Sequence, residues 1–81
     1  MFFLEQRKRR LRDYQNEILS YATALARDSE LAQDLRQECA VRVLRAKDAP
    51  KEERSYKAWM FKILRNLWLD HLRRTGRQNE T

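Results

Sequence analysis

The residues from 55 to 75 combine positive charge with aromatic rings in a way that suits nucleic acid. Treated as a helix at about 100° per residue, this stretch leaves a narrow strip outside its apolar face, and the strip carries Lys62, Arg65, Asn66 and Arg73. Cations there would meet phosphates, an amide can donate and accept at a base edge, and aromatic faces stack on unpaired bases. The strip therefore predicts nucleic-acid binding.

The two tryptophans of this stretch allow a second interpretation. Trp59 and Trp68 could both pack in a core, while the Lys and Arg side chains merely solvate the helix. The spacing favours the core for Trp59 and leaves Trp68 open between packing and stacking.

No constellation for catalysis or metal binding accompanies the strip. His71 is the only histidine and Cys39 the only cysteine, and neither has a second ligand at metal-binding spacing. Asp70 and His71 are sequence neighbours, so on a helix they point about 100° apart. His71 is interpreted as a structural or helix-end polar group. With no Gly-rich phosphate loop and no nucleophile beside a base, we expect no enzyme activity, no metal and no cofactor.

Three helical stretches must position these residues. Composition favours helices, because one Gly and one Pro leave few residues for tight turns. Apolar residues at steps of three and four predict helices at 8–27, 29–46 and 55–75, with a loop at 47–54 that contains Pro50. The expected fold is all-α, a compact three- to four-helix bundle in which a short N-terminal turn would be the fourth element.

Polar residues mark the expected ends of these helices. The first helix should stop near Arg27, and either Asp28 or Ser29 can cap the second helix. Ser55 is expected to cap the third helix, and Gly76 to terminate it in a left-handed conformation.

The middle helix has two faces of different character. Its apolar face consists of residues that recur at helical spacing, namely Leu31, Ala32, Leu35, Cys39 and Val43. The opposite side is a polar stripe with one β-branched residue in it, namely Asp34, Gln37, Glu38, Val41 and Arg45. Val41 is out of place on a purely solvated face, which makes the stripe a candidate contact surface, although single exposed valines are common.

Length and charge set the remaining expectations. The 81 residues allow one domain, 1–81, with a modest core. The net charge is +6, with a basic N-terminal segment at 1–10 and further basic residues after 54, which favours nucleic acid before an acidic membrane surface. The run from Arg7 to Arg12 is either a DNA contact or, as we prefer, a solvated helix start. A lone cysteine suggests a cytoplasmic setting, and no apolar run could span a membrane.

Two segments resemble the sigma-70 superfamily of bacterial transcription initiation factors. Residues 31–38, LAQDLRQE, are similar to the acidic AEDLVQE segment of that family, and residues 56–74 are similar to its FRAWLFRIARNLAIDHLRR helix. The resemblance covers residues 14–77. The most similar group is the extracytoplasmic-function (ECF) sigma factors, whose conserved region two is a compact helical domain.

The resemblance implies two binding surfaces. One docks on the clamp helices of the largest RNA polymerase subunit and, carried over by position, consists of Asp34, Leu35, Gln37, Glu38, Val41 and Arg45. Leu35 is the exception there, because the periodicity places it on the core face. The other surface, with the loop before the third helix, recognises and melts the minus-ten promoter element, and its residues are Lys57, Trp59, Lys62, Arg65, Asn66, Trp68, Asp70, Arg73 and Arg74. An anti-sigma factor is a further partner that the family admits.

The sequence also departs from the family. Ala40 stands where a large residue is usual, and the loop 47–54 is richer in charge than usual, so base preference cannot be carried over. The C-terminal helix-turn-helix domain is absent, which leaves open a fragment or a short relative. Two other interpretations stay open: a sigma-like regulator that binds protein and no DNA, and a nucleic-acid-binding bundle unrelated to transcription.

Overall fold

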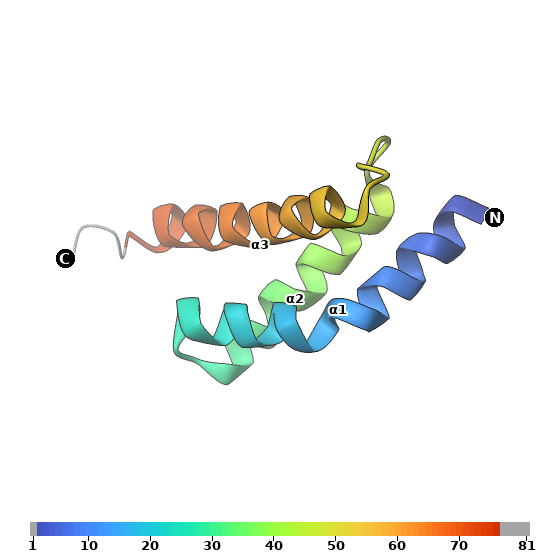
Figure 1. Cartoon of the computed structure of the whole chain (residues 1–81). Coiled ribbons are helices and arrows are strands. Elements are labelled where there is room, and N and C mark those ends of the chain that lie inside the picture. Colours follow the sequence, from blue (N-terminus) through green and yellow to red (C-terminus); the bar gives the residue numbers. More distant parts are fainter. Residues whose placement is uncertain (1, 77–81) are drawn as a thin grey trace.

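The computed structural model describes residues 2–76, which form three helices (Figure 1). α1 spans Phe2–Ala26, α2 spans Ser29–Arg45 and α3 spans Glu53–Thr75, and this part of the chain contains no strand. The all-α prediction and its three main helices are confirmed. The expected domain also includes residues 1 and 77–81, which lie outside the described residues.

Two helix boundaries differ from those expected. α1 already includes Phe2, so the described N-terminal residues extend this helix and do not form a separate fourth turn. α3 begins at Glu53, and its N-cap residue is Glu52 in place of the expected Ser55. The hydroxyl of Ser55 instead donates to Oε1 of Glu52 over 3.1 Å. The loop between α2 and α3 is therefore shorter than expected and consists of residues 46–52.

The other helix ends follow the polar residues of the sequence. Asp28 caps α2, because its Oδ1 accepts hydrogen bonds from the backbone N–H groups of Glu30 (3.0 Å) and Leu31 (3.2 Å). Arg27 has φ 55°, a left-handed conformation that ends α1 without a glycine. Gly76 has φ 73° and ends α3 as expected, since glycine adopts this region without a steric cost.

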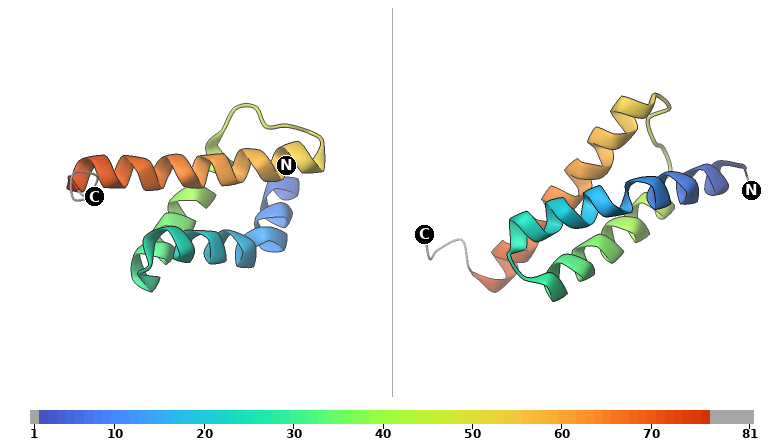
Figure 2. Two further views of the ribbon diagram at one scale, coloured as in Figure 1. Left: turned by 60° about the vertical axis from the view of Figure 1, so that its left-hand side comes forward. Right: turned by 60° about the horizontal axis from the view of Figure 1, so that its bottom comes forward.

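α1 and α2 run side by side in opposite directions, and α3 packs on both of them (Figure 1, Figure 2). The start of α1, the end of α2 and the start of α3 meet at the end of the bundle that carries the loop 46–52. α3 continues beyond this junction towards the far end of the molecule. Its outer face thus forms a long exposed edge.

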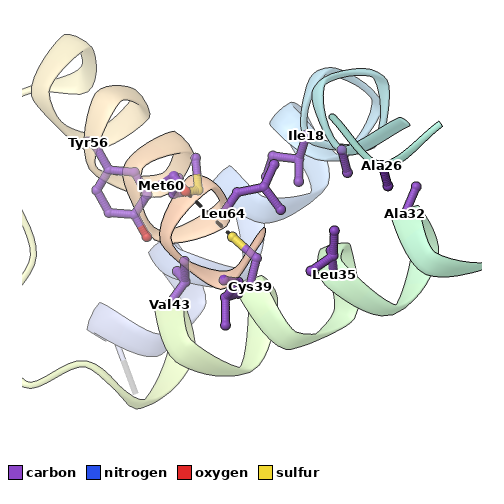
Figure 3. Close-up of a cluster of buried hydrophobic side chains, with 11 residues drawn as sticks. Ile18, Ala26, Ala32, Leu35, Cys39, Val43, Tyr56, Met60 and Leu64 are labelled. Carbon is purple, nitrogen blue, oxygen red and sulfur yellow. Dashed lines mark hydrogen bonds between the residues drawn. The ribbon is translucent and has the colours of Figure 1, made fainter. Parts of the chain in front are cut away.

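The core lies where the three helices face one another (Figure 3). α1 contributes Ile18, Ala22 and Ala26, and the other buried apolar residues are Ala32, Leu35, Cys39, Val43, Tyr56, Met60, Leu64 and Leu67. The buried residues of α2 belong to the apolar face that its periodicity predicts. The thiol of Cys39 donates to the carbonyl oxygen of Met60, 3.6 Å away, and so joins α2 to α3 inside this core.

Candidate functional site

The polar stripe of α2 faces solvent. Its residues are all exposed, as expected, and Val41 keeps 38% of its surface accessible: Asp34, Gln37, Glu38, Val41 and Arg45. Leu35 is only 6% exposed, which confirms the core position that its periodicity predicts and leaves it little surface for a direct contact with a partner. Its side chain packs in the core because it lies on the same helix face as Ala32 and Cys39.

Only one ion pair lies along the described part of this stripe. Nε of Arg42 is 3.7 Å from Oε2 of Glu38, and both side chains are more than half exposed. A pair this exposed contributes little to stability, because water and salt screen it. The carboxylate of Glu38 therefore remains available to a partner.

The outer strip of α3 is also exposed. Lys62, Arg65, Asn66 and Arg73 all face solvent, and Leu69 among them is 38% exposed. Lys62 and Arg65 take part in none of the ion pairs in the described part of the chain. These two cations are therefore the ones most readily offered to phosphates.

Asp70 forms ion pairs with the two arginines near the end of α3. Its Oδ1 is 3.5 Å from Nη2 of Arg73, and its Oδ2 is 3.3 Å from Nε of Arg74. The carboxylate offsets part of the positive charge there. A phosphate at this end of α3 must compete with Asp70 for the same guanidinium groups.

Lys57 does not belong to the outer strip. Its Nζ is 2.6 Å from Oε2 of Glu17, and it also lies over the rings of Tyr14 and Phe61, at 5.4 Å and 5.9 Å from their centroids. At about 100° per residue, Lys57 and Lys62 point about 140° apart. The expected DNA-binding set is therefore divided between two sides of α3, and Lys57 faces α1.

The two tryptophans lie on different flanks of α3, and both are half-buried. The ring of Trp59 packs edge-on against Tyr56, with centroids 5.2 Å apart. The ring of Trp68 stacks on His71, with centroids 5.8 Å apart and an interplanar angle of 20°. Trp59 lies on the side of the strip that carries Asn66, whereas Trp68 lies on the side of Lys57. His71 thus packs against the ring of Trp68.

A cleft of about 650 Å³ lies between α1 and the loop 46–52. Tyr56 lies at the cleft with 3% of its surface exposed, and no group of the described residues hydrogen-bonds its hydroxyl. Burial raises the pKa of this tyrosine, and the nearby Arg7 and Arg10 act against that rise. The charged residues that line the cleft are Arg7, Arg10, Lys47, Asp48 and Lys51.

Sequence reasoning missed the role of Arg7 and Arg10. Nη1 of Arg7 donates to the carbonyl oxygen of Val43 (3.1 Å) and to that of Ala46. Nη2 of Arg10 is 3.5 Å from the carbonyl oxygen of Lys51, at the limit of a hydrogen bond. Both arginines are half-buried, so neither is a plain solvated helix start.

Cys39 is a core residue and not a reactive thiol. It has no exposed surface, and burial raises its pKa to about 11. The thiolate is the reactive form of cysteine, so this raised pKa disfavours oxidation and metal binding. Across the described residues, no cluster of three or more His, Cys, Asp or Glu side chains could hold a metal ion.

The fold and surfaces define a class of protein: a small helical bundle with an exposed basic strip, flanked by half-buried tryptophans, on one helix and an exposed polar stripe on another. None of its described helices has the length and apolar character needed to cross a membrane.

Comparison with known proteins identifies the family. The family model described as Sigma-70 region 2 matches residues 11–78. A probable RNA polymerase sigma factor of Haemophilus influenzae is 31% identical over 67 residues, which are 83% of this chain and 34% of that protein. No solved structure matches the chain. The chain therefore belongs to the sigma-70 region 2 family, and it spans about a third of the length of the curated relative.

Proposed function

We propose that this chain is the part of a transcription initiation factor that binds RNA polymerase and the minus-ten promoter element in the cytoplasm. The family membership supports a role in transcription initiation. The observation that carries the finer proposal is the separation of two exposed surfaces, the polar stripe of α2 and the basic strip of α3. One factor can then hold the polymerase and the promoter together. The ECF type of factor is part of the same proposal.

The polar stripe of α2 would dock on the clamp helices of the largest polymerase subunit. Its support is the exposure of Asp34, Glu38 and Val41 on one face, with an apolar residue among charged ones. Interfaces of this kind combine a desolvated apolar contact with charges that fix orientation. Leu35 would act only by holding the stripe from inside the core.

The basic strip of α3 would hold the non-template strand of the minus-ten element. Lys62 and Arg65 would bind phosphates, and Asn66 would contact a base edge. Trp59, half-buried on the same side as Asn66, offers part of its ring for stacking. Lys57 faces α1 and pairs with Glu17, so in this proposal it stabilises the packing of α3 on α1 and does not bind DNA.

The cleft beside the loop 46–52 would receive one extruded base. Extrusion costs a few kcal/mol, which stacking and hydrogen bonds in a pocket must offset. The cleft is lined by Tyr56 and has cations at its rim. Its volume of about 650 Å³ leaves ample room for a single base.

Polymerase binding tests the first surface. Replacing Glu38 with Lys should weaken binding to the clamp helices by about tenfold, because charge reversal at a contact acts directly on association. The domain should stay folded, since Glu38 is exposed and its only ion pair in the described structure is weak. Asp13→Lys, an equal charge change at an exposed position of α1, is the control. Equal affinities for the wild type and Glu38→Lys would contradict the proposal.

Promoter binding tests the second surface, with polymerase that carries a complete factor containing this domain. Asn66→Ala should relax discrimination at one base position, at a cost of about 1–3 kcal/mol for the preferred base. Lys62→Ala should weaken all sequences alike and lower the salt dependence by about one released ion. Lys62 is a cleaner probe than Arg73, whose side chain already pairs with Asp70. If both substitutions act equally on every promoter variant, Asn66 does not read a base.

A second candidate function is a sigma-like module that binds a regulator, such as an anti-sigma factor, and no DNA. The observation that favours it is an open groove of about 720 Å³ between α1 and α3. Tyr21 and Phe61 line this groove and pack edge to face, with centroids 5.5 Å apart. If promoter DNA shows no salt-dependent binding, this candidate replaces the first.

A further inference from the structure

Four residues on one side of α1 make polar contacts with the segment that begins at the end of α2 and ends in the second turn of α3. Arg7, Arg10, Tyr14 and Glu17 follow one another at steps of three, four and three, so they lie along one stripe of the helix. Their partners fall between residues 43 and 57. We name these four residues the α1 latch.

Arg7 holds the point where α2 ends and the loop begins. The last carbonyl groups of a helix have no partner within it, and the negative end of the helix dipole lies there. Nη1 of Arg7 supplies that partner for two carbonyl oxygens, those of Val43 (3.1 Å) and Ala46. A guanidinium in this position both satisfies the carbonyls and neutralises the dipole.

Arg10 holds the other end of the loop. Its guanidinium carbon lies 4.5 Å from the centroid of the Tyr56 ring, in position for a cation–π contact, while Nη2 approaches the carbonyl oxygen of Lys51. The loop between the two arginines has little order of its own. In the described structure, residues 47–51 take part in no backbone–backbone hydrogen bond.

Tyr14 and Glu17 continue the latch onto the start of α3. The hydroxyl of Tyr14 donates to Oε2 of Glu53 over 2.6 Å, which also raises the pKa of the tyrosine. Glu17 pairs with Lys57 over 2.6 Å. The first turns of α3 are therefore tied to α1 as well as packed on the core.

We propose that the α1 latch sets the conformation of the loop 46–52 and, through it, the base preference of the cleft. Arg7 and Arg10 are positioning residues in this proposal, because their guanidinium groups are engaged by backbone carbonyls and a ring. Both lie before residue 11, where the match to the family model begins. The effect on base preference rests on the proposed function of the cleft, whereas the effect on loop order does not.

Backbone NMR relaxation of the 81-residue chain tests the hold on the loop. In Arg7→Ala, the order parameters of the loop 46–52, Pro50 excepted, should fall from about 0.85 to below about 0.6, while those of buried Leu64 and Met60 stay at the rigid value. Arg9→Ala is the control, since Arg9 lies on the exposed side of α1 and its replacement removes the same charge. Arg7→Lys, which keeps a donor, should recover part of the order. Equal loop order parameters in Arg7→Ala and Arg9→Ala overturn the proposal.

Base preference tests the consequence, with polymerase that carries a complete factor containing each variant. The ratio of affinities for promoters that differ at the extruded base should fall about fivefold in Arg7→Ala, the lower end of what a lost base contact costs. Arg9→Ala should keep the wild-type ratio. A merely structural role would weaken all promoters alike and leave the ratio unchanged, and that result overturns the proposal.

The two hypotheses fail in different ways. If the wild type shows no preference at any base, the proposed function of the cleft is wrong, and the link from the latch to base preference falls with it. If the wild type has a preference that Arg7→Ala retains, the cleft keeps its proposed function and the latch does not tune it.

Discussion

The apolar core and the α1 latch join the same three helices by different physical means. In the core, residues such as Ile18, Met60 and Leu64 lose almost all contact with water, and the release of that water drives the packing. In the latch, Arg7 and Arg10 reach backbone carbonyls, and Tyr14 and Glu17 reach charged side chains. The core joins the helices by burying apolar surface, and the latch joins them by directional polar contacts.

The difference shows what each region can specify. Burial is roughly proportional to area and does not depend on exact angles, so a core tolerates small shifts of its helices. A hydrogen bond weakens steeply once its angle is poor, so the latch fixes the position of the loop it holds. We therefore expect the core to account for most of the stability and the latch for the shape of the loop 46–52.

The largest effect should come from the core. Leu64 has no exposed surface, so Leu64→Ala should lower the free energy of unfolding by about 3 kcal/mol through lost burial and the cavity left behind. Leu69→Ala removes the same atoms from a residue of α3 that is 38% exposed, and it should cost less than about 1 kcal/mol. Urea unfolding followed by circular dichroism measures both. Similar losses would mean that burial does not distinguish the two positions.

The core should also make stability depend on alkaline pH. Burial raises the pKa of Cys39 from 9.0 to about 11 in the folded chain, while the unfolded thiol keeps its ordinary value. Between these values the unfolded state loses a proton that the folded state keeps, so stability is full below pH 9 and falls as pH rises. The slope should reach about 1.4 kcal/mol per pH unit.

Cys39→Ala isolates this contribution. Tyr14 and Tyr56 also have raised pKa values, but they titrate in both proteins, so the difference between the two stability curves belongs to the thiol. The variant should be less stable than the wild type at neutral pH, and the gap should narrow towards pH 11. Parallel curves from pH 8 to 11 would show that the thiol keeps an ordinary pKa in the folded chain.

The core and the helix caps could be predicted from the sequence because their signals are local. Burial in a helix repeats every three to four residues, so Leu35, Cys39 and Val43 could be assigned to one face without any structure. The cap of α2 by Asp28 involves groups only two and three residues away. Leu35 is an example, because its periodicity alone predicts the burial that the structure shows.

The latch could not be predicted, because its partners are distant and have no side-chain signature. Arg7 reaches a carbonyl 36 residues away, and every residue has a carbonyl. The only local signal is that Arg7 stands four residues before Leu11 and so continues the apolar stripe of α1. The separation of Lys57 from the outer strip of α3 could not be predicted for the same reason, since its partner is Glu17 on another helix.

The cap of α2 is polar like the latch, but its hydrogen bonds are local. Asp28→Ala should lower the free energy of unfolding by about 1 kcal/mol, since two N–H groups lose their acceptor. Ser29→Ala, one residue further along, should change stability by less than about 0.5 kcal/mol. The loop 46–52 should keep its wild-type NMR order parameters in both variants. Lower order parameters of that loop in Asp28→Ala would mean that its order follows global stability and not the latch.

The smallest effect should come from the outermost contact of the latch, the pair of Glu17 and Lys57. Its atoms are 2.6 Å apart, but the side chains are 51% and 39% exposed, so solvent screens the attraction. Glu17→Gln should therefore cost less than about 1 kcal/mol at low salt, and the cost should shrink further in high salt.

A double-mutant cycle with Lys57→Met separates the pair from its surroundings. The coupling between the two substitutions should be a few tenths of a kcal/mol at low salt and should approach zero at about 1 M salt, where charges are screened within about 3 Å. Lys57 also lies over the rings of Tyr14 and Phe61, and that contact should survive in Glu17→Gln. A coupling above about 2 kcal/mol that persists in high salt would mean that this ion pair stabilises the fold as much as a core contact does. The core would then not account for most of the stability at the start of α3.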